Sequence, residues 1–125
     1  MSPVVDTTVL IDVLRGHPHA VDYVLGLEEV PVCSEVTRVE VVRGLRSDER
    51  RSADRLFERL RWVSVDEAVA RLAGEFGRRF RRSHASIGVA DLIIAATADH
   101  LGLALATTNV RHFPMLKGLR PAYRD

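Results

Sequence analysis

The stretch GVADLIIAATADHLGLALATTNVRHF (residues 88–113) decides the fold that we predict. Residues 92–98 are apolar except for one threonine, which predicts a helix that is buried on all sides. Asp91 stands at the head of this helix, where a carboxylate needs a hydrogen bond, an ion pair or a metal ion. Gly102 is a typical helix end. Residues 103–107 then predict a buried strand that brings polar residues to its carboxyl end, where open α/β sheets bind ligands.

Length and composition set the class of protein. The 125 residues, 46% of them hydrophobic, predict one domain over residues 1–125 with an ordinary core. Eighteen basic and 17 acidic residues leave a net charge of +1, which neither requires nor excludes a polyanionic partner. The single cysteine, Cys33, cannot form an internal disulfide, and this favours a reducing compartment. No apolar stretch approaches the ~20 residues of a transmembrane helix, and the N-terminus lacks a signal segment. We therefore expect a cytoplasmic protein with no membrane contact.

The rest of the chain predicts strands that alternate with pairs of helices. Short apolar runs predict strands at residues 3–5, 30–33 and 62–65. Apolar residues at helical spacing, with Ser34 and Asp66 as N-caps, predict helices at residues 9–16, 18–27, 35–46, 48–60 and 67–82. A short helical turn ended by Pro114 and an edge strand near residues 121–123 complete the chain. This order predicts a three-layer α/β/α sandwich with a central, mostly parallel sheet.

Acidic side chains gather at one edge of that predicted sheet. Asp6 ends the first strand, Asp91 opens the buried helix, Glu40 projects from a helix beside the sheet, and residues 107–109 leave the last core strand. Because the carboxyl ends of parallel strands share one edge, these groups can meet there. Carboxylates in one pocket repel one another unless a cation compensates their charge, and hard oxygen ligands favour Mg²⁺ or Mn²⁺ over zinc. Such an ion can activate a water and neutralise a phosphodiester without a protein nucleophile.

Four stretches of the sequence carry a family resemblance. They resemble the signature blocks of PIN-domain ribonucleases and, more narrowly, those of the VapC toxins of bacterial toxin–antitoxin pairs. The stretches are VVDTTVLIDVLRG (residues 4–16), EVTRVEVVRGL (35–45), GVADLIIAATA (88–98) and LATTNVRHF (105–113). They occur in order over nearly the whole chain, and together they are highly specific. The resemblance implies a PIN-like fold, a Mg²⁺- or Mn²⁺-dependent endoribonuclease, an RNA substrate, a VapB-like antitoxin and a homodimer.

The resemblance also implies a role for individual residues. The family's catalytic, metal-binding acids fall on Asp6, Glu40 and Asp91. Thr8 matches the position two residues after the first acid, whose side chain helps to hold the metal site. We predict that Thr8 and Thr107 support the site.

The last block departs from the family pattern at two positions. Asn109 stands where the family has a fourth acid, and His112 stands where some members have another. The amide of Asn109 can still bind a metal or its water, so we expect a weak ligand that adds no charge. The sequence is compatible with a site for one metal ion or for two.

Two further features leave alternatives open. The arginine-rich segment at residues 78–82 can be a solvated helix end that complements the helix dipole, or it can contact RNA phosphates. We expect Asp12 and Asp99 to be surface or supporting groups. For the homodimer, we expect aromatic side chains outside the core to supply the interface, namely Trp62, Phe76, Phe80 and Phe113.

Two other function classes compete with the nuclease. A haloacid-dehalogenase-like hydrolase is disfavoured, because position 8 is a threonine instead of a second acid and the only lysine is Lys117. The alternative that remains is a degenerate PIN-like domain, which lacks the fourth acid and only binds RNA or a protein partner.

Overall fold

A four-stranded sheet lies at the centre of the computed structural model, which describes residues 1–84 and 86–124. The strands are β1 (Val4–Val5), β2 (Val32–Ser34), β3 (Arg61–Val63) and β4 (Leu105–Ala106). Their order is β3-β2-β1-β4, and every neighbouring pair is parallel. Val4 of the central strand stands opposite Val32 on one side and Leu105 on the other. The predicted parallel sheet is therefore confirmed, with strands shorter than the apolar runs suggested.

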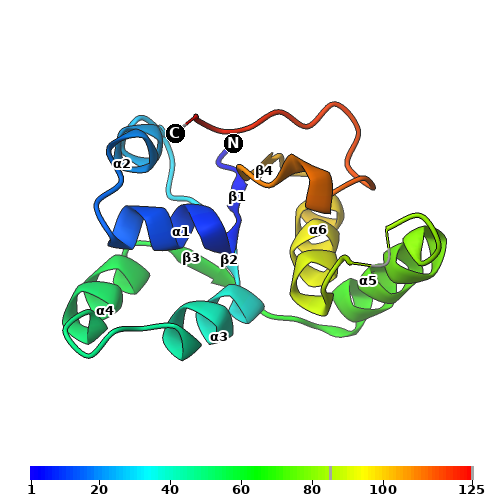
Figure 1. The fold of residues 1–125 in the computed structure, drawn as a ribbon, viewed down its shortest axis with the longest axis horizontal. Coiled ribbons are helices and arrows are strands. Elements are labelled where there is room, and N and C mark those ends of the chain that lie inside the picture. Colours follow the sequence, from blue (N-terminus) through cyan, green and yellow to red (C-terminus); the bar gives the residue numbers. More distant parts are fainter. Residues whose placement is uncertain (85, 125) are drawn as a thin grey trace.

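Helices cover both faces of the sheet. They are α1 (Thr7–Leu14), α2 (Pro18–Leu25), α3 (Glu35–Arg43), α4 (Arg50–Glu58), α5 (Glu67–Phe80) and α6 (Val89–Leu101), followed by the 3-10 turn η1 (Val110–His112). Helices α5 and α6 lie on one side of the strands, and α1, α2 and α4 lie on the other (Figure 1). This arrangement confirms the three-layer sandwich. No helix within the described residues has both the length and the apolar character needed to cross a membrane.

Alternation along the strands divides the core into two clusters. Val4, Val32 and Leu105 join the cluster under α5 and α6. Their chain neighbours Val5, Cys33 and Ala106 join the cluster on the opposite face, with residues of α1, α3 and α4. Successive side chains of a strand point to opposite faces, so both faces of this sheet are buried. The apolar runs in the sequence are unbroken for that reason.

Helix α6 has the burial that its composition predicts. Five consecutive residues, Ile94 to Ala98, are buried, while Asp99 is exposed. Gly102 ends the helix with φ of +67°, a left-handed conformation that glycine adopts without steric cost. A buried α6 fixes the position of its first turn, where Asp91 stands.

The C-terminal segment differs from the prediction. Residues 121–123 form no strand, although Ala122 N donates a hydrogen bond to Thr107 O, directly after β4, at 2.9 Å. The edge-strand prediction is wrong, because β4 has only two residues and Pro121 has no N–H to donate. The Tyr123 hydroxyl instead donates to Oδ2 of Asp12 at 2.6 Å, which makes Asp12 a structural group.

The predicted dimer aromatics are also partly wrong. Phe76 and Phe113 are only 5% and 1% exposed, and both pack in the cluster under α5 and α6. Neither can supply an exposed interface. Trp62 and Phe80 are only partly buried.

Candidate functional site

Asp6 is held at the junction between β1 and α1. Its Oδ1 accepts a hydrogen bond from the backbone N–H of Thr7 at 2.8 Å, so it caps α1. Its Oδ2 accepts from the hydroxyls of Thr8, at 2.9 Å, and Thr107, at 2.6 Å. The side chain is almost fully buried, with 3% of its surface exposed. Both predicted supporting threonines therefore contact the first acid directly and fix its orientation.

Glu40 reaches the same region from α3. The hydroxyl of Thr7 donates to its Oε1 at 2.6 Å and lies 3.1 Å from the hydroxyl of Thr37. Thr7, the residue directly after Asp6, thus binds the second acid. We did not predict Thr7 or Thr37 from the sequence. Two positional features could have indicated them: Thr7 follows Asp6 directly, and Thr37 lies one turn before Glu40 on the same helix.

Asp91 lies in the first turn of α6, close to η1. Its Oδ2 is 3.1 Å from Nδ1 of His112, and its side chain is 22% exposed. Burial raises the pKa of Asp91, and the negative charges of Asp6 and Glu40 raise it further, while His112 lowers it. The charges of the other two predicted metal ligands therefore reach Asp91. The contact with His112 was not predicted, because that residue was considered only as a substitute for an acid.

Asn109 connects the carboxyl end of β4 to the same network. Its backbone N–H donates to the Thr107 hydroxyl at 3.0 Å, and its Nδ2 donates to the Thr8 hydroxyl at 3.3 Å. The side chain is exposed, and its Oδ1 is the amide atom not used in these contacts. Asn109 therefore lies beside the threonines that hold Asp6, at the edge where we expected it.

The chemistry of the donor set suits a hard divalent cation. Carboxylate, hydroxyl and amide oxygens are the ligands that Mg²⁺ and Mn²⁺ accept. The pKa of Asp91 is raised mainly by burial and in addition by the charges of Asp6 and Glu40, and a cation would compensate this second part. Across residues 1–84 and 86–124, however, no three His, Cys, Asp or Glu side chains lie close enough together to form a metal-binding group as they stand. The acids instead bind neighbouring threonines and His112. Metal binding would require these side chains to turn toward a shared ion.

Comparison with known proteins identifies the class of protein that has this fold and this site. Residues 4–117 match the family model of the PIN domain, and the chain therefore belongs to the PIN domain family. Within that family its relatives are VapC proteins. Ribonuclease VapC19 of Mycobacterium tuberculosis is 42% identical over 123 residues, which cover 95% of this chain and 98% of the relative. Ribonuclease VapC10 of the same species is 45% identical over 121 residues, which cover 95% and 91%. These matches confirm the predicted resemblance.

A solved structure supports the fold independently. A chain in a toxin–antitoxin complex from Klebsiella pneumoniae superimposes with a TM-score of 0.81, over 99% of this chain and 100% of that one. The two sequences are 22% identical, so this likeness concerns the fold.

Proposed function

We propose that this protein is a metal-dependent endoribonuclease of the VapC type and the toxin of a toxin–antitoxin pair. One observation carries the proposal: the three acids come from separate elements to the carboxyl edge of the sheet. Thr7 and its neighbour Thr8 hold Glu40 and Asp6, and Asp91 contacts His112 of the turn after β4. Burial raises the pKa of Asp91, and the charges of Asp6 and Glu40 raise it further. Two relatives at more than 40% identity bear the name ribonuclease. Acids gathered in this way suit hydrolysis of a phosphodiester, whose charge must be neutralised during attack.

In this proposal Asp6, Glu40 and Asp91 hold a Mg²⁺ or Mn²⁺ ion, with Asn109 as a weak further ligand. The bound ion would supply an activated water and neutralise charge on the phosphate. The protein's own part is to hold the acids near the carboxyl edge of the sheet through hydrogen bonds, from which their side chains would turn toward the ion.

Each acid has its own positioning residue. The hydroxyls of Thr8 and Thr107 hold Asp6, that of Thr7 holds Glu40, and His112 contacts Asp91. None of these neighbours adds negative charge, so the site's charge comes from the acids themselves.

A structural neighbour suggests a protein partner for this chain. Because a structural neighbour forms a toxin–antitoxin complex, we propose that a VapB-like antitoxin binds this chain. We also propose a homodimer and a cytoplasmic location, where an RNA substrate is available.

A second candidate is a non-catalytic domain that binds RNA or protein. Two observations favour it: an amide at position 109 in place of an acid, and the lack of a ready three-residue metal group in the described part of the chain. The nuclease is better supported, because acids from three separate elements lie near enough for Asp6 and Glu40 to affect the pKa of Asp91, and because two relatives at more than 40% identity are named ribonucleases.

The decisive experiment measures cleavage of single-stranded RNA by the purified protein with Mg²⁺, with Mn²⁺ and with excess chelator. Asp6→Asn and Asp91→Asn should each lower activity by more than the roughly 10- to 100-fold typical of residues that only support a metal ligand. Asp99→Asn is the matched control, since Asp99 is exposed on the same helix as Asp91. It should cleave like the wild type.

Three outcomes separate the alternatives. Cleavage that persists in excess chelator contradicts the metal mechanism. RNA binding without cleavage under any metal condition supports the non-catalytic domain. Equal activity of Asp99→Asn and Asp91→Asn contradicts the placement of the site.

A further inference from the structure

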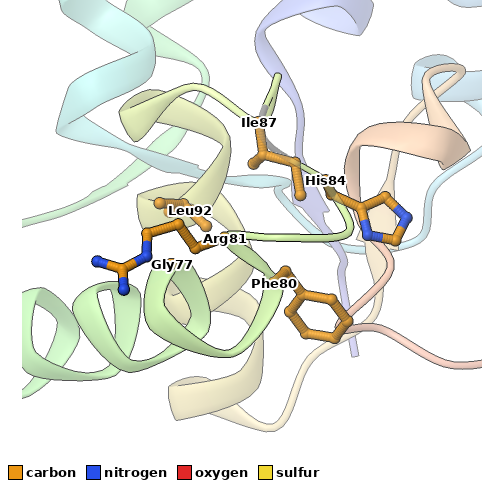
Figure 2. A pocket seen from close by; sticks show the side chains of 6 residues that line it. All are labelled: Gly77, Phe80, Arg81, His84, Ile87 and Leu92. Carbon is orange, nitrogen blue, oxygen red and sulfur yellow. The ribbon is translucent and has the colours of Figure 1, made fainter.

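A small cavity lies between the end of α5 and the start of α6. Its volume is about 140 Å³, and it is lined by Gly77, Phe80, Arg81, His84, Ile87 and Leu92 (Figure 2). Sites for drug-sized ligands have roughly 300–1,000 Å³. A cavity of this size suits a single flat ring.

One wall of the cavity comes from the first turn of α6, which also carries Asp91. Leu92, which forms part of its wall, directly follows Asp91 in the chain. Ile87, another wall residue, directly precedes Gly88, the N-cap of the same helix. A group held in the cavity is therefore positioned by the same helical turn that carries Asp91.

The lining combines apolar walls with polar groups. Ile87, Leu92 and the ring of Phe80 provide apolar surface. Figure 2 shows the rings of Phe80 and His84 on one side of the cavity, with their centres 5.7 Å apart, while the guanidinium of Arg81 extends away on the other side. The hydroxyl of Ser83 lies 2.8 Å from Nδ1 of His84, which leaves Nε2 of that ring for another partner. Unstacked RNA bases are bound by this combination: an aromatic ring or guanidinium plane for the base face, and a polar atom for its edge.

Positive charge surrounds the cavity. Arg81 and Arg82 are exposed and form no ion pair within the described residues. Arg79 has its guanidinium 5.2 Å from the centre of the Phe80 ring and thus reinforces one wall. Uncompensated arginines beside a ring-sized cavity fit a ligand that carries both a base and a phosphate.

We infer that this cavity receives one nucleobase of the RNA substrate beside the scissile phosphate and so helps to select the cleavage sequence. The inference rests on the proposed nuclease function. The base enters between Phe80 and Leu92, its phosphates face the free arginines, and His84 contacts its edge.

Gly77 offers a direct way to close the cavity. A Cβ atom at this position would lie 3.1 Å from Cδ1 of Leu92, so a larger side chain there must occupy the space. Gly74 lies one turn earlier on α5, and a Cβ there would meet no atom within 4 Å. Gly74→Leu is therefore a matched control for Gly77→Leu, because both replace a glycine inside the same helix by the same residue.

The experiment determines cleavage sites in a random-sequence RNA pool and kcat/KM on the RNA that the wild type prefers. Gly77→Leu should lose the base preference at one position next to the cut. Its kcat/KM should fall by roughly 5- to 150-fold, which corresponds to the ~1–3 kcal/mol of one stacked base. Gly74→Leu should keep the wild-type preference and rate.

The outcomes distinguish this inference from the proposed function. If the wild type cleaves RNA while a folded Gly77→Leu retains its preference and kcat/KM, the cavity is not a base site, but the nuclease stands. If the wild type cleaves no RNA, both fail. If Gly77→Leu changes inhibition by an antitoxin without changing RNA preference, the cavity binds protein, and the inference is overturned. Should Gly77→Leu not fold, Phe80→Ala removes the stacking ring and must produce the same loss of preference.

Discussion

Thr107→Val tests whether the hydroxyl network holds the first acid. The Thr107 side chain is fully buried, and its hydroxyl donates to Oδ2 of Asp6 at 2.6 Å. Valine keeps the branched shape but removes this donor. A hydrogen bond to a charged group contributes ~1.5–3 kcal/mol. Asn109 N–H, which also binds this hydroxyl, belongs to an exposed residue and can turn to water, so it adds little.

The expected change is a fall of ~1.5–3 kcal/mol in the free energy of unfolding. For a chain of this size, 1 kcal/mol corresponds to roughly 4 °C, so Tm should fall by roughly 6–12 °C. The assay is urea and thermal unfolding of the metal-free protein at pH 7, monitored by circular dichroism.

Thr97→Val provides the control. Thr97 is also fully buried, but its hydroxyl donates to the neutral backbone carbonyl of Ile93, at 2.8 Å. A neutral bond contributes only ~0.5–1.5 kcal/mol. Equal losses for the two variants would refute the view that Thr107 acts mainly through the charge of Asp6.

Three further predictions concern charge and assembly. Because its pKa is raised, Asp91 binds its proton more tightly in the folded state than in the unfolded state, so its ionisation lowers stability as pH rises above the ordinary value of 3.8. Asp91→Asn should therefore stabilise the metal-free protein at pH 7, by ~0.5–2 kcal/mol, and the gain should vanish below pH 3.8 in urea titrations; a less stable variant at pH 7 would make Asp91 a structural cap. Asn109→Asp should strengthen Mn²⁺ binding in calorimetric titration, since it adds a charged oxygen beside the acids, and unchanged affinity would place Asn109 outside the metal site. Light scattering should give twice the 13.9 kDa chain mass, and Val39→Asp should shift it toward the monomer, because Val39 and Val42 are 63% and 47% exposed on α3; a wild-type mass of one chain at micromolar concentration would contradict the dimer.

The sequence predicted which residues meet at the edge of the sheet better than it predicted their individual contacts. Asp6 and residues 107–109 follow the ends of neighbouring parallel strands, so topology alone brings them together, and the Thr107–Asp6 bond is the result. The contact of Thr7 with Glu40 has no such origin. It depends on how α1 packs against α3, and hydrophobic spacing predicts that a helix buries a face without giving the neighbour of each polar side chain.

The aromatic residues show a similar limit. Phe76 lies on the apolar face of the amphipathic helix α5. Whether its ring packs in the core or stays exposed for an interface depends on where α6 lies. Phe113 follows a three-residue turn in a segment without any periodicity. Its burial at 1% exposure comes from the path of the tail, which no local pattern encodes.

The order of the strands has a consequence for the timing of synthesis. The first strand made, β1, is an inner strand of the sheet, and one of its two neighbours is β4, the last to be made. Asp6 is made well before the Thr107 hydroxyl that orients it, which comes 101 residues later in the chain. Since chains fold from the N-terminus during synthesis, a nascent chain can bury most of the cluster that packs against α1, α3 and α4 and still lack an assembled acidic site. Any activity that depends on this site therefore begins only after β4 and the residues that follow it have been made.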